Sequence, residues 1–408
     1  MGLIALIGIS MSADLKHVMY PGTNVDYFIV EDRCDGSSVE NIKVNLIFGT
    51  PHLPPSKSAS TTRASGQTTA TSSSSSSGAT KTFTSVNPVG AGYNKGMSVG
   101  LFNYGGSVLA NAISGMKDLG TRWVRMDFPW SKMEPAGPGR YNTGAWDNAV
   151  RAAASGGMQI LGIIDYSPDW SRPTGTNQFY PPTNMADYAA FCSYVVNRYS
   201  SMGVHAWEIW NEENGSTFWQ PKPDPAVYTA MLAAAYQAIK RADPRAMVIL
   251  GGMATFTDDG VNYNARTFLT RIYADGGRQY FDAVGFHPYV YPDMPGNADG
   301  NNWQQMFATT PSLRSIMTEN GDESKRIWIT EMGYPNFIGN PALTEQNQAI
   351  TVQQAYRLQA TYSWAGPLFW YTYRDGGNDP ANQEDWFGLV RYDGTQKPAY
   401  KTYRSIPR

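Results

Sequence analysis

Residues 206–214 combine a strand pattern with polar side chains that could act on a substrate. They read Ala-Trp-Glu-Ile-Trp-Asn-Glu-Glu-Asn. Because side chains alternate along a strand, Glu208, Trp210 and Glu212 are predicted on one face and Asn211 on the other. A carboxyl group buried without a partner is costly. Glu212, at the point where the strand ends and a loop begins, is therefore predicted to belong to a functional site.

A second carboxyl group, that of Glu331, ends the stretch Trp-Ile-Thr-Glu at residues 328–331. Two such groups facing one another suit glycoside hydrolysis. One protonates the leaving oxygen, and the other attacks the anomeric carbon or activates water. The pair can do this only if the fold brings Glu212 and Glu331 together and separates their pKa values.

Short apolar segments alternate with helical ones from about residue 95 onward. Most of the apolar segments are continuously apolar, as in parallel strands covered on both faces. Strands are predicted over residues 96–102, 122–128, 159–165, 206–210, 246–251, 283–287, 326–331 and 367–371. Helices are predicted over residues 108–119, 143–154, 185–200, 225–241, 265–274, 344–364 and 397–405.

This alternation predicts an α/β fold, a (β/α)8 TIM barrel over residues 91–408. A doubly wound sheet is the alternative, but the eight units and the lack of a Gly-rich phosphate loop after the first strand count against it. Functional groups of such barrels lie at the C-terminal ends of the strands. Glu212 and Glu331 follow the fourth and seventh strands, roughly opposite each other across the barrel mouth.

Two further zones precede the barrel. Residues 1–50 contain β-branched segments at 25–30 and 42–48, which predict a small β-rich unit. A unit of this size is near the lower limit for independent folding, so self-association or an assembly partner is expected. Residues 51–90 are rich in Ser and Thr and predict a disordered linker. Such tethers suggest an extracellular, cell-surface or virion-associated location.

Composition excludes several classes of protein. The net charge of −2 argues against a nucleic-acid partner, which would favour a basic surface. No apolar run is long enough for a membrane span. None of the four histidines is spaced as one of a pair of metal ligands, so neither a metal nor another cofactor is expected. Cys34 and Cys192 lie in different modules, and no disulfide is expected.

Three segments resemble the signatures of a known clan. They are Trp-Asn-Glu at 210–212, His-Pro-Tyr at 287–289, and Trp-Ile-Thr-Glu-Met-Gly-Tyr at 328–334. They are similar to those of the retaining (β/α)8 glycosidases that place the acid/base on strand four and the nucleophile on strand seven. Within this clan the chain looks most like the family thirty-nine group of xylosidase-like and exopolysaccharide-cleaving enzymes. The resemblance extends from about residue 95 to the C-terminus.

The resemblance implies a role for each matching residue. Glu212 would be the acid/base and Glu331 the nucleophile, while Asn211 would hydrogen-bond the sugar 2-hydroxyl. Arg125 and Tyr289 would donate to Glu331. From the residues alone, Arg125 could equally be the salt-bridge partner of a core carboxylate, a role for which Glu208 is the structural candidate.

Other positions are expected to surround this pair. The resemblance places His287 in the polar floor, a structural role, and Trp370 as the platform beneath the sugar. Glu213 stands where many relatives have Pro, and a second carboxylate there is expected to raise the pKa of Glu212. Asp165 and Asp169 are candidates for sugar contacts, although capping of the following loop is the default.

Indoles in the predicted mouth loops indicate sugar subsites. They are Trp130, Trp170, Trp219, Trp303 and Trp386. Long loops also need hydrophobic anchors, which is an equally good explanation for any one of them. Their number favours a cleft and endo-action on a polymer.

The leading hypothesis is a retaining, endo-acting glycoside hydrolase. Its partner would be a β-linked cell-wall or extracellular polysaccharide, cleaved by double displacement. The alternative is a carbohydrate-binding adhesin, or a structural component of a surface or phage-tail assembly with little turnover. The two can coexist in a tail-borne depolymerase.

Overall fold

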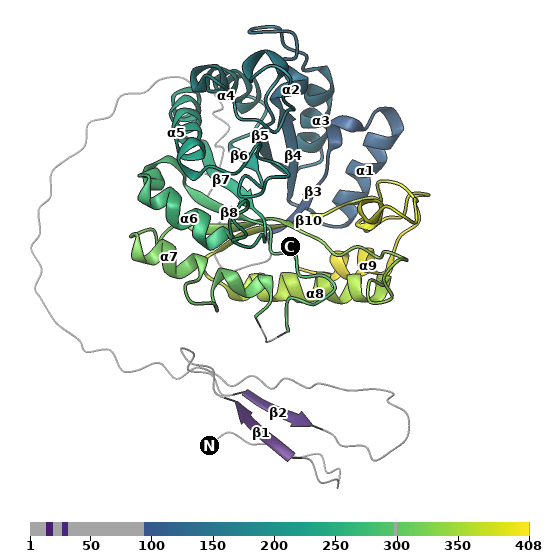
Figure 1. Ribbon diagram of the computed structural model, residues 1–408. Coiled ribbons are helices and arrows are strands. Elements are labelled where there is room, and N and C mark those ends of the chain that lie inside the picture. The colour runs from purple at the N-terminus through teal and green to yellow at the C-terminus, as the bar shows by residue number, and fades with distance from the viewer. Residues whose placement is uncertain (1–13, 19–26, 32–93, 298–299, 408) are drawn as a thin grey trace, which may run out of the picture. The chain divides into compact units, whose positions relative to one another are not determined.

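The computed structural model describes residues 14–18, 27–31, 94–297 and 300–407, and the chain divides into two units, residues 1–80 and 81–408 (Figure 1). In the first unit, β1 (Asp14–Val18) pairs antiparallel with β2 (Tyr27–Glu31). The predicted strand at 25–30 overlaps β2. The predicted strand at 42–48 and the linker at 51–90 lie outside the described residues, so the proposed boundaries of these zones stay predictions.

The second unit contains a closed barrel of eight parallel strands in the order β10-β3-β4-β5-β6-β7-β8-β9. The strands are β3 (Lys95–Ser98), β4 (Trp123–Pro129), β5 (Gln159–Asp165), β6 (Ala206–Asn211), β7 (Met247–Met253), β8 (Ala283–Phe286), β9 (Arg326–Met332) and β10 (Ala365–Tyr371). Each overlaps a predicted strand. The predicted (β/α)8 barrel is therefore confirmed.

Helices surround the barrel (Figure 1). The α-helices are α1 (Gly106–Asp118), α2 (Trp130–Met133), α3 (Gly144–Ser155), α4 (Met185–Ser200), α5 (Pro225–Ala242), α6 (Ala265–Ala274), α7 (Leu313–Glu319), α8 (Glu345–Thr361) and α9 (Pro398–Ser405). The 3₁₀ helices are η1 (Leu101–Asn103), η2 (Asp169–Ser171), η3 (Gly277–Tyr280), η4 (Asn302–Met306) and η5 (Gln383–Trp386). None of the described helices is both long and apolar enough to cross a membrane.

A capping residue and a proline explain where the long helix α5 begins. Asp224 caps α5, accepting hydrogen bonds from the backbone of Ala226 at 3.0 Å and Val227 at 3.1 Å, and Pro225 occupies the first helical turn. The short helices α2 and α7 were not predicted, because four and seven residues give too little periodicity.

Apolar residues fill the barrel on the side away from the strand C-termini. One cluster takes a residue from each of seven strands: Trp123, Leu161, Ala206, Ile249, Ala283, Trp328 and Phe369. Two positions further along their strands, Arg125 and Glu208 form a buried ion pair, so the interior becomes polar toward the mouth. This change from apolar plug to charged layer positions the site above it.

Candidate active site

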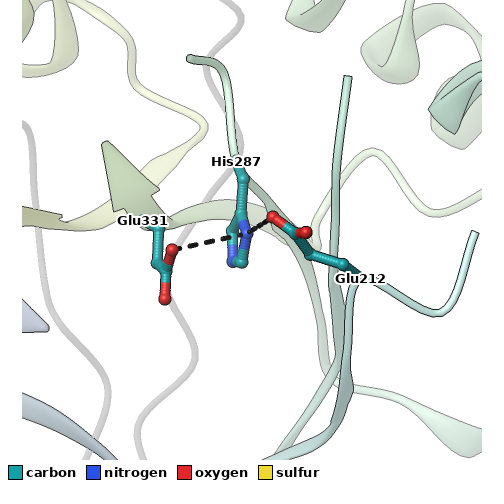
Figure 2. Close-up of side chains that lie close together, drawn as sticks. All are labelled: Glu212, His287 and Glu331. Atoms are coloured by element: carbon teal, nitrogen blue, oxygen red, sulfur yellow. Dashed lines mark hydrogen bonds and ion pairs between the residues drawn. The ribbon is translucent and has the colours of Figure 1, made fainter. Parts of the chain in front are cut away.

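A cleft of about 670 Å³ opens at the C-terminal ends of the barrel strands, and Glu212 and Glu331 both line it. Glu212 follows β6, the fourth barrel strand, and Glu331 lies on β9, the seventh. Figure 2 shows the two side chains on either side of His287, with a dashed line from each carboxyl group to the imidazole ring. The fold thus brings together the two carboxyl groups that the sequence predicted.

The separation of the two glutamates is short. One carboxylate oxygen of each and a ring nitrogen of His287 all lie within 4.8 Å of one another. Retaining glycosidases hold their two carboxyl groups about 5–5.5 Å apart, whereas inverting ones leave about 6.5–9.5 Å for a water molecule. The geometry therefore fits a nucleophile and an acid/base.

These three side chains are also the group among the described residues that could hold a metal ion. Hydrogen bonds and an ion pair already engage them. His287 Nδ1 lies 2.9 Å from Glu212 Oε1, and Arg125 forms an ion pair with Glu331. A cation would have to displace these contacts, so the donor set fits acid–base chemistry better than metal binding.

Glu331 accepts from the two predicted donors, Arg125 and Tyr289, and also from Ser98, whose hydroxyl lies 3.4 Å from its Oε1. Arg125 Nη1 donates to its Oε1, and the Tyr289 hydroxyl donates to its Oε2 at 2.9 Å. These bonds orient the carboxylate toward the cleft.

Arg125 also binds carboxylate and amide groups inside the barrel, so this one side chain has both of the roles predicted for it. Its Nε donates to Glu208 Oε2 at 2.6 Å, and its Nη2 donates to Asn211 Oδ1 at 2.8 Å. Because Asn211 Oδ1 accepts from Arg125, its Nδ2 is the atom that can donate to a sugar hydroxyl in the cleft that Asn211 lines.

Glu212 has the electrostatics of a proton donor. Burial raises its pKa to about 7, and the positive charge of Arg125 opposes the rise. The neighbouring His287 is fully buried, which lowers the pKa of its imidazole to about 4 against the opposing charge of Glu331. Its Nδ1 lies 2.9 Å from Glu212 Oε1 and its Nε2 lies 3.1 Å from the Thr330 hydroxyl oxygen, and the tautomer of the neutral ring decides which atom donates in each contact. Sequence reasoning placed His287 in the floor but had no signal for this direct contact.

Glu213 interacts with Glu212 as a neighbouring carboxyl group. Burial raises the pKa of Glu212, and burial together with the charges of Glu208 and Glu212 raises the pKa of Glu213. Glu213 is itself fully buried, and burial raises the pKa of its carboxyl well above the ordinary value. Gly251 leaves room for it, since a Cβ there would collide with Glu213 Oε2. Burial thus favours the neutral form of Glu213.

The predicted alternation along β6 fails near the site. Glu208 and Asn211 both contact Arg125 inside the barrel, whereas Trp210 packs in the outer core. Trp210 and Glu212 have φ angles of 70° and 52°, the left-handed region that non-glycine residues rarely adopt. These two residues turn the backbone, which places Asn211 and Glu212 together in the cleft.

The tryptophan predictions are largely wrong. Trp370 and Trp130 are fully buried in the core and cannot lie beneath a sugar. Trp130 Nε1 donates to the Glu134 side chain at 2.6 Å, and Trp170 Nε1 donates to the Glu134 backbone oxygen at 2.8 Å. The two indoles anchor a loop, which is the alternative that the sequence left open.

Trp219 and Trp303 are also buried, and neither they nor Trp170 and Trp386 line the cleft. Its aromatic lining consists of Tyr104, Tyr166, Phe218, Phe256, Tyr289, Tyr291, Tyr371 and Phe387. Tyr371, next to the predicted Trp370, is the strand-eight aromatic residue that faces the cleft. Position along the strand could not distinguish the two rings.

Comparison with known proteins identifies the family to which this chain belongs. The model of the family "Cellulase (glycosyl hydrolase family 5)" matches residues 86–367, more than half of the chain. The chain belongs to this family. Family membership and the barrel support glycosidase activity. No curated protein sequence matches the chain.

Solved structures share the barrel of this family 5 member. A family 39 glycoside hydrolase from Bacteroides cellulosilyticus WH2 superposes with a TM-score of 0.62 at 24% identity, over 78% of this chain and 63% of that enzyme. A monomeric β-xylosidase from Caulobacter crescentus CB15 gives 0.58 at 18% identity, over 78% and 69%. The family 39 enzyme from Xanthomonas axonopodis pv. citri gives 0.57 at 17% identity, over 78% and 67%. This chain thus spans less than two thirds of the first enzyme. The predicted resemblance to (β/α)8 glycosidases is thus confirmed, and the family 39 enzymes share the fold.

Proposed function

We propose that this protein is a retaining, endo-acting glycoside hydrolase of a β-linked cell-wall or extracellular polysaccharide. The observation that carries the proposal is the Glu212–Glu331 pair, with oxygens within 4.8 Å at the ends of the fourth and seventh barrel strands. This separation supports double displacement.

In the first step the Glu331 carboxylate attacks the anomeric carbon while Glu212 gives its proton to the leaving oxygen. The products are a glycosyl ester of Glu331 and a shortened chain that carries a new hydroxyl. In the second step ionised Glu212 takes a proton from water, whose oxygen attacks the anomeric carbon and releases Glu331. Asn211 Nδ2 donates to the 2-hydroxyl, and this bond strengthens as the transition state forms.

Endo-action is supported by the extent of the hollow surface. A second hollow of about 430 Å³ shares Tyr104 and Arg374 with the cleft. The two hollows adjoin at these residues, which supports binding of sugars beyond the cleaved bond. The β-linkage is supported by the β-xylosidase of Caulobacter crescentus among the enzymes of the same fold.

The test is a panel of β-linked cell-wall and extracellular polysaccharides, with the first-formed anomer followed by NMR and chain length by viscosity. A β-anomer first, with viscosity falling faster than reducing ends appear, is expected. An α-anomer first would overturn the retaining mechanism. Release of monosaccharides alone would overturn endo-action, and binding without any turnover would favour the adhesin alternative.

The pKa of Glu212 predicts the pH profile. Glu212 must be protonated to act as the acid, and burial raises its pKa to about 7. As pH rises through this value the acid form is lost, so kcat/KM should fall by about tenfold per pH unit above it. Initial rates between pH 5 and 9 on a substrate with a poor leaving group measure this. This fall of kcat/KM at high pH should disappear in Glu212→Gln. The same fall in that variant would contradict the assignment.

We also propose that residues 1–50 and 51–90 attach the barrel to a surface or virion assembly outside the cytoplasm. The Ser/Thr-rich composition of residues 51–90 supports a tether.

A further inference from the structure

Two carboxyl groups outside the catalytic pair meet beside the cleft. Asp127 lies near the end of β4 and lines the cleft, while Asp165 ends the neighbouring strand β5. Asp165 is fully buried, and no donor among the described residues reaches either of its oxygens. The expected capping role of Asp165 is therefore wrong, because a cap would accept from the loop backbone.

The carboxyl groups of Asp165 and Asp127 are close enough to interact, and a hydrogen bond between them needs a proton on one of the two. Burial first, and then the charge and hydrogen bond of Asp127, raise the pKa of Asp165 well above the ordinary value. Two adjacent carboxylates cannot both ionise at low cost. Burial and the neighbouring carboxylate therefore favour the protonated form of Asp165, which can donate a hydrogen bond to Asp127.

This arrangement leaves Asp127 as an acceptor facing the cleft. A carboxylate offers about four lone-pair sites, and Asp165 uses one of them. Tyr166, which follows Asp165 and also lines the cleft, is partly buried and has a φ of 55°, so the backbone turns there. The double displacement uses Glu212 and Glu331 and leaves Asp127 without a chemical step.

We propose that Asp127 is a specificity-determining residue that accepts a hydrogen bond from a hydroxyl of the sugar in the cleft, positioned by the buried carboxyl of Asp165. The inference rests on the proposed glycosidase function and names the ligand class, a neutral hydroxyl-bearing sugar ring. An anionic sugar, such as a uronic acid, is disfavoured. Four residues that line the cleft carry carboxyl groups, Asp127, Glu212, Glu331 and Glu384, against one guanidinium, that of Arg374.

The test uses aryl β-glycosides of the sugar that wild type cleaves, with their 3-, 4- and 6-deoxy analogues. Asp127→Ala should lower kcat/KM by about 10- to 100-fold, the range for a hydrogen bond to a charged group. One deoxy analogue should lose a similar factor in wild type, and little further in Asp127→Ala. An unchanged cost of every deoxy position in the variant would overturn the proposal. An inactive wild type would instead refute the proposed function.

The positioning role of Asp165 is tested by comparing a substitution that keeps a hydrogen-bond donor with one that removes it. Asp165→Asn keeps an N–H donor toward Asp127 and should retain kcat/KM within about threefold, whereas Asp165→Ala removes the donor and should behave as Asp127→Ala does. Thermal unfolding of each variant separates loss of positioning from loss of fold. Asp169→Asn is the matched control, because its carboxyl is 90% exposed and pairs with Arg172. Equal losses in Asp165→Asn and Asp165→Ala would overturn the positioning role.

Discussion

Replacing Glu331 with Gln is expected to lower kcat by at least about a thousandfold, because an amide cannot attack the anomeric carbon. The fold should survive. Gln matches Glu in size, its amide oxygen can still accept from Arg125, and its NH2 group can donate to the hydroxyl oxygen of Tyr289. Turnover of the polysaccharide found in the panel, together with the thermal unfolding midpoint, measures both effects.

A matched control is Glu319→Gln, which removes an exposed carboxylate at the end of α7 and should behave as wild type. Mass spectrometry of wild type after reaction with a 2-deoxy-2-fluoro glycoside should find the sugar on Glu331. Wild-type turnover in Glu331→Gln, or a label on another residue, would refute the assignment of the nucleophile.

Replacing Arg125 with Met should damage both the fold and the reaction. Arg125 and Glu208 are 1% and 0% exposed, so the substitution leaves a buried carboxylate without its cation. Breaking such a pair from one side costs about 3–5 kcal/mol in the free energy of unfolding. Glu331 also loses a donor, so kcat should fall. Denaturant unfolding and initial rates measure the two losses.

The double variant Arg125→Met/Glu208→Gln separates the loss of stability from the loss of activity. Removing the orphaned charge should restore part of the free energy of unfolding, because a neutral amide is cheaper to bury than a carboxylate. Activity should stay low, since nothing replaces the bond from Arg125 to Glu331. Recovery of turnover in the double variant would show that Arg125 acts through stability alone.

Much of this protein could be predicted from local patterns. All eight barrel strands could be predicted, because strands buried on both faces are continuously apolar. Glu212 and Glu331 could be predicted because functional groups of such barrels lie at strand ends. The helices α2 and α7 were too short for periodicity to detect. The indoles were misassigned, since a tryptophan in a loop has the same sequence pattern whether it anchors the loop or faces a cleft.

The sequence by itself determined the barrel and the two glutamates, because hydrophobic periodicity and position along a strand depend on neighbours in the chain. Only the tertiary structure decided which side chains surround them. The left-handed backbone of Trp210 and Glu212 overrides strand alternation and turns Asn211 and Glu212 into the cleft. Likewise, burial sets the pKa of Glu212 near 7. Both depend on atoms distant in sequence that exclude water and fill the space around the strand end.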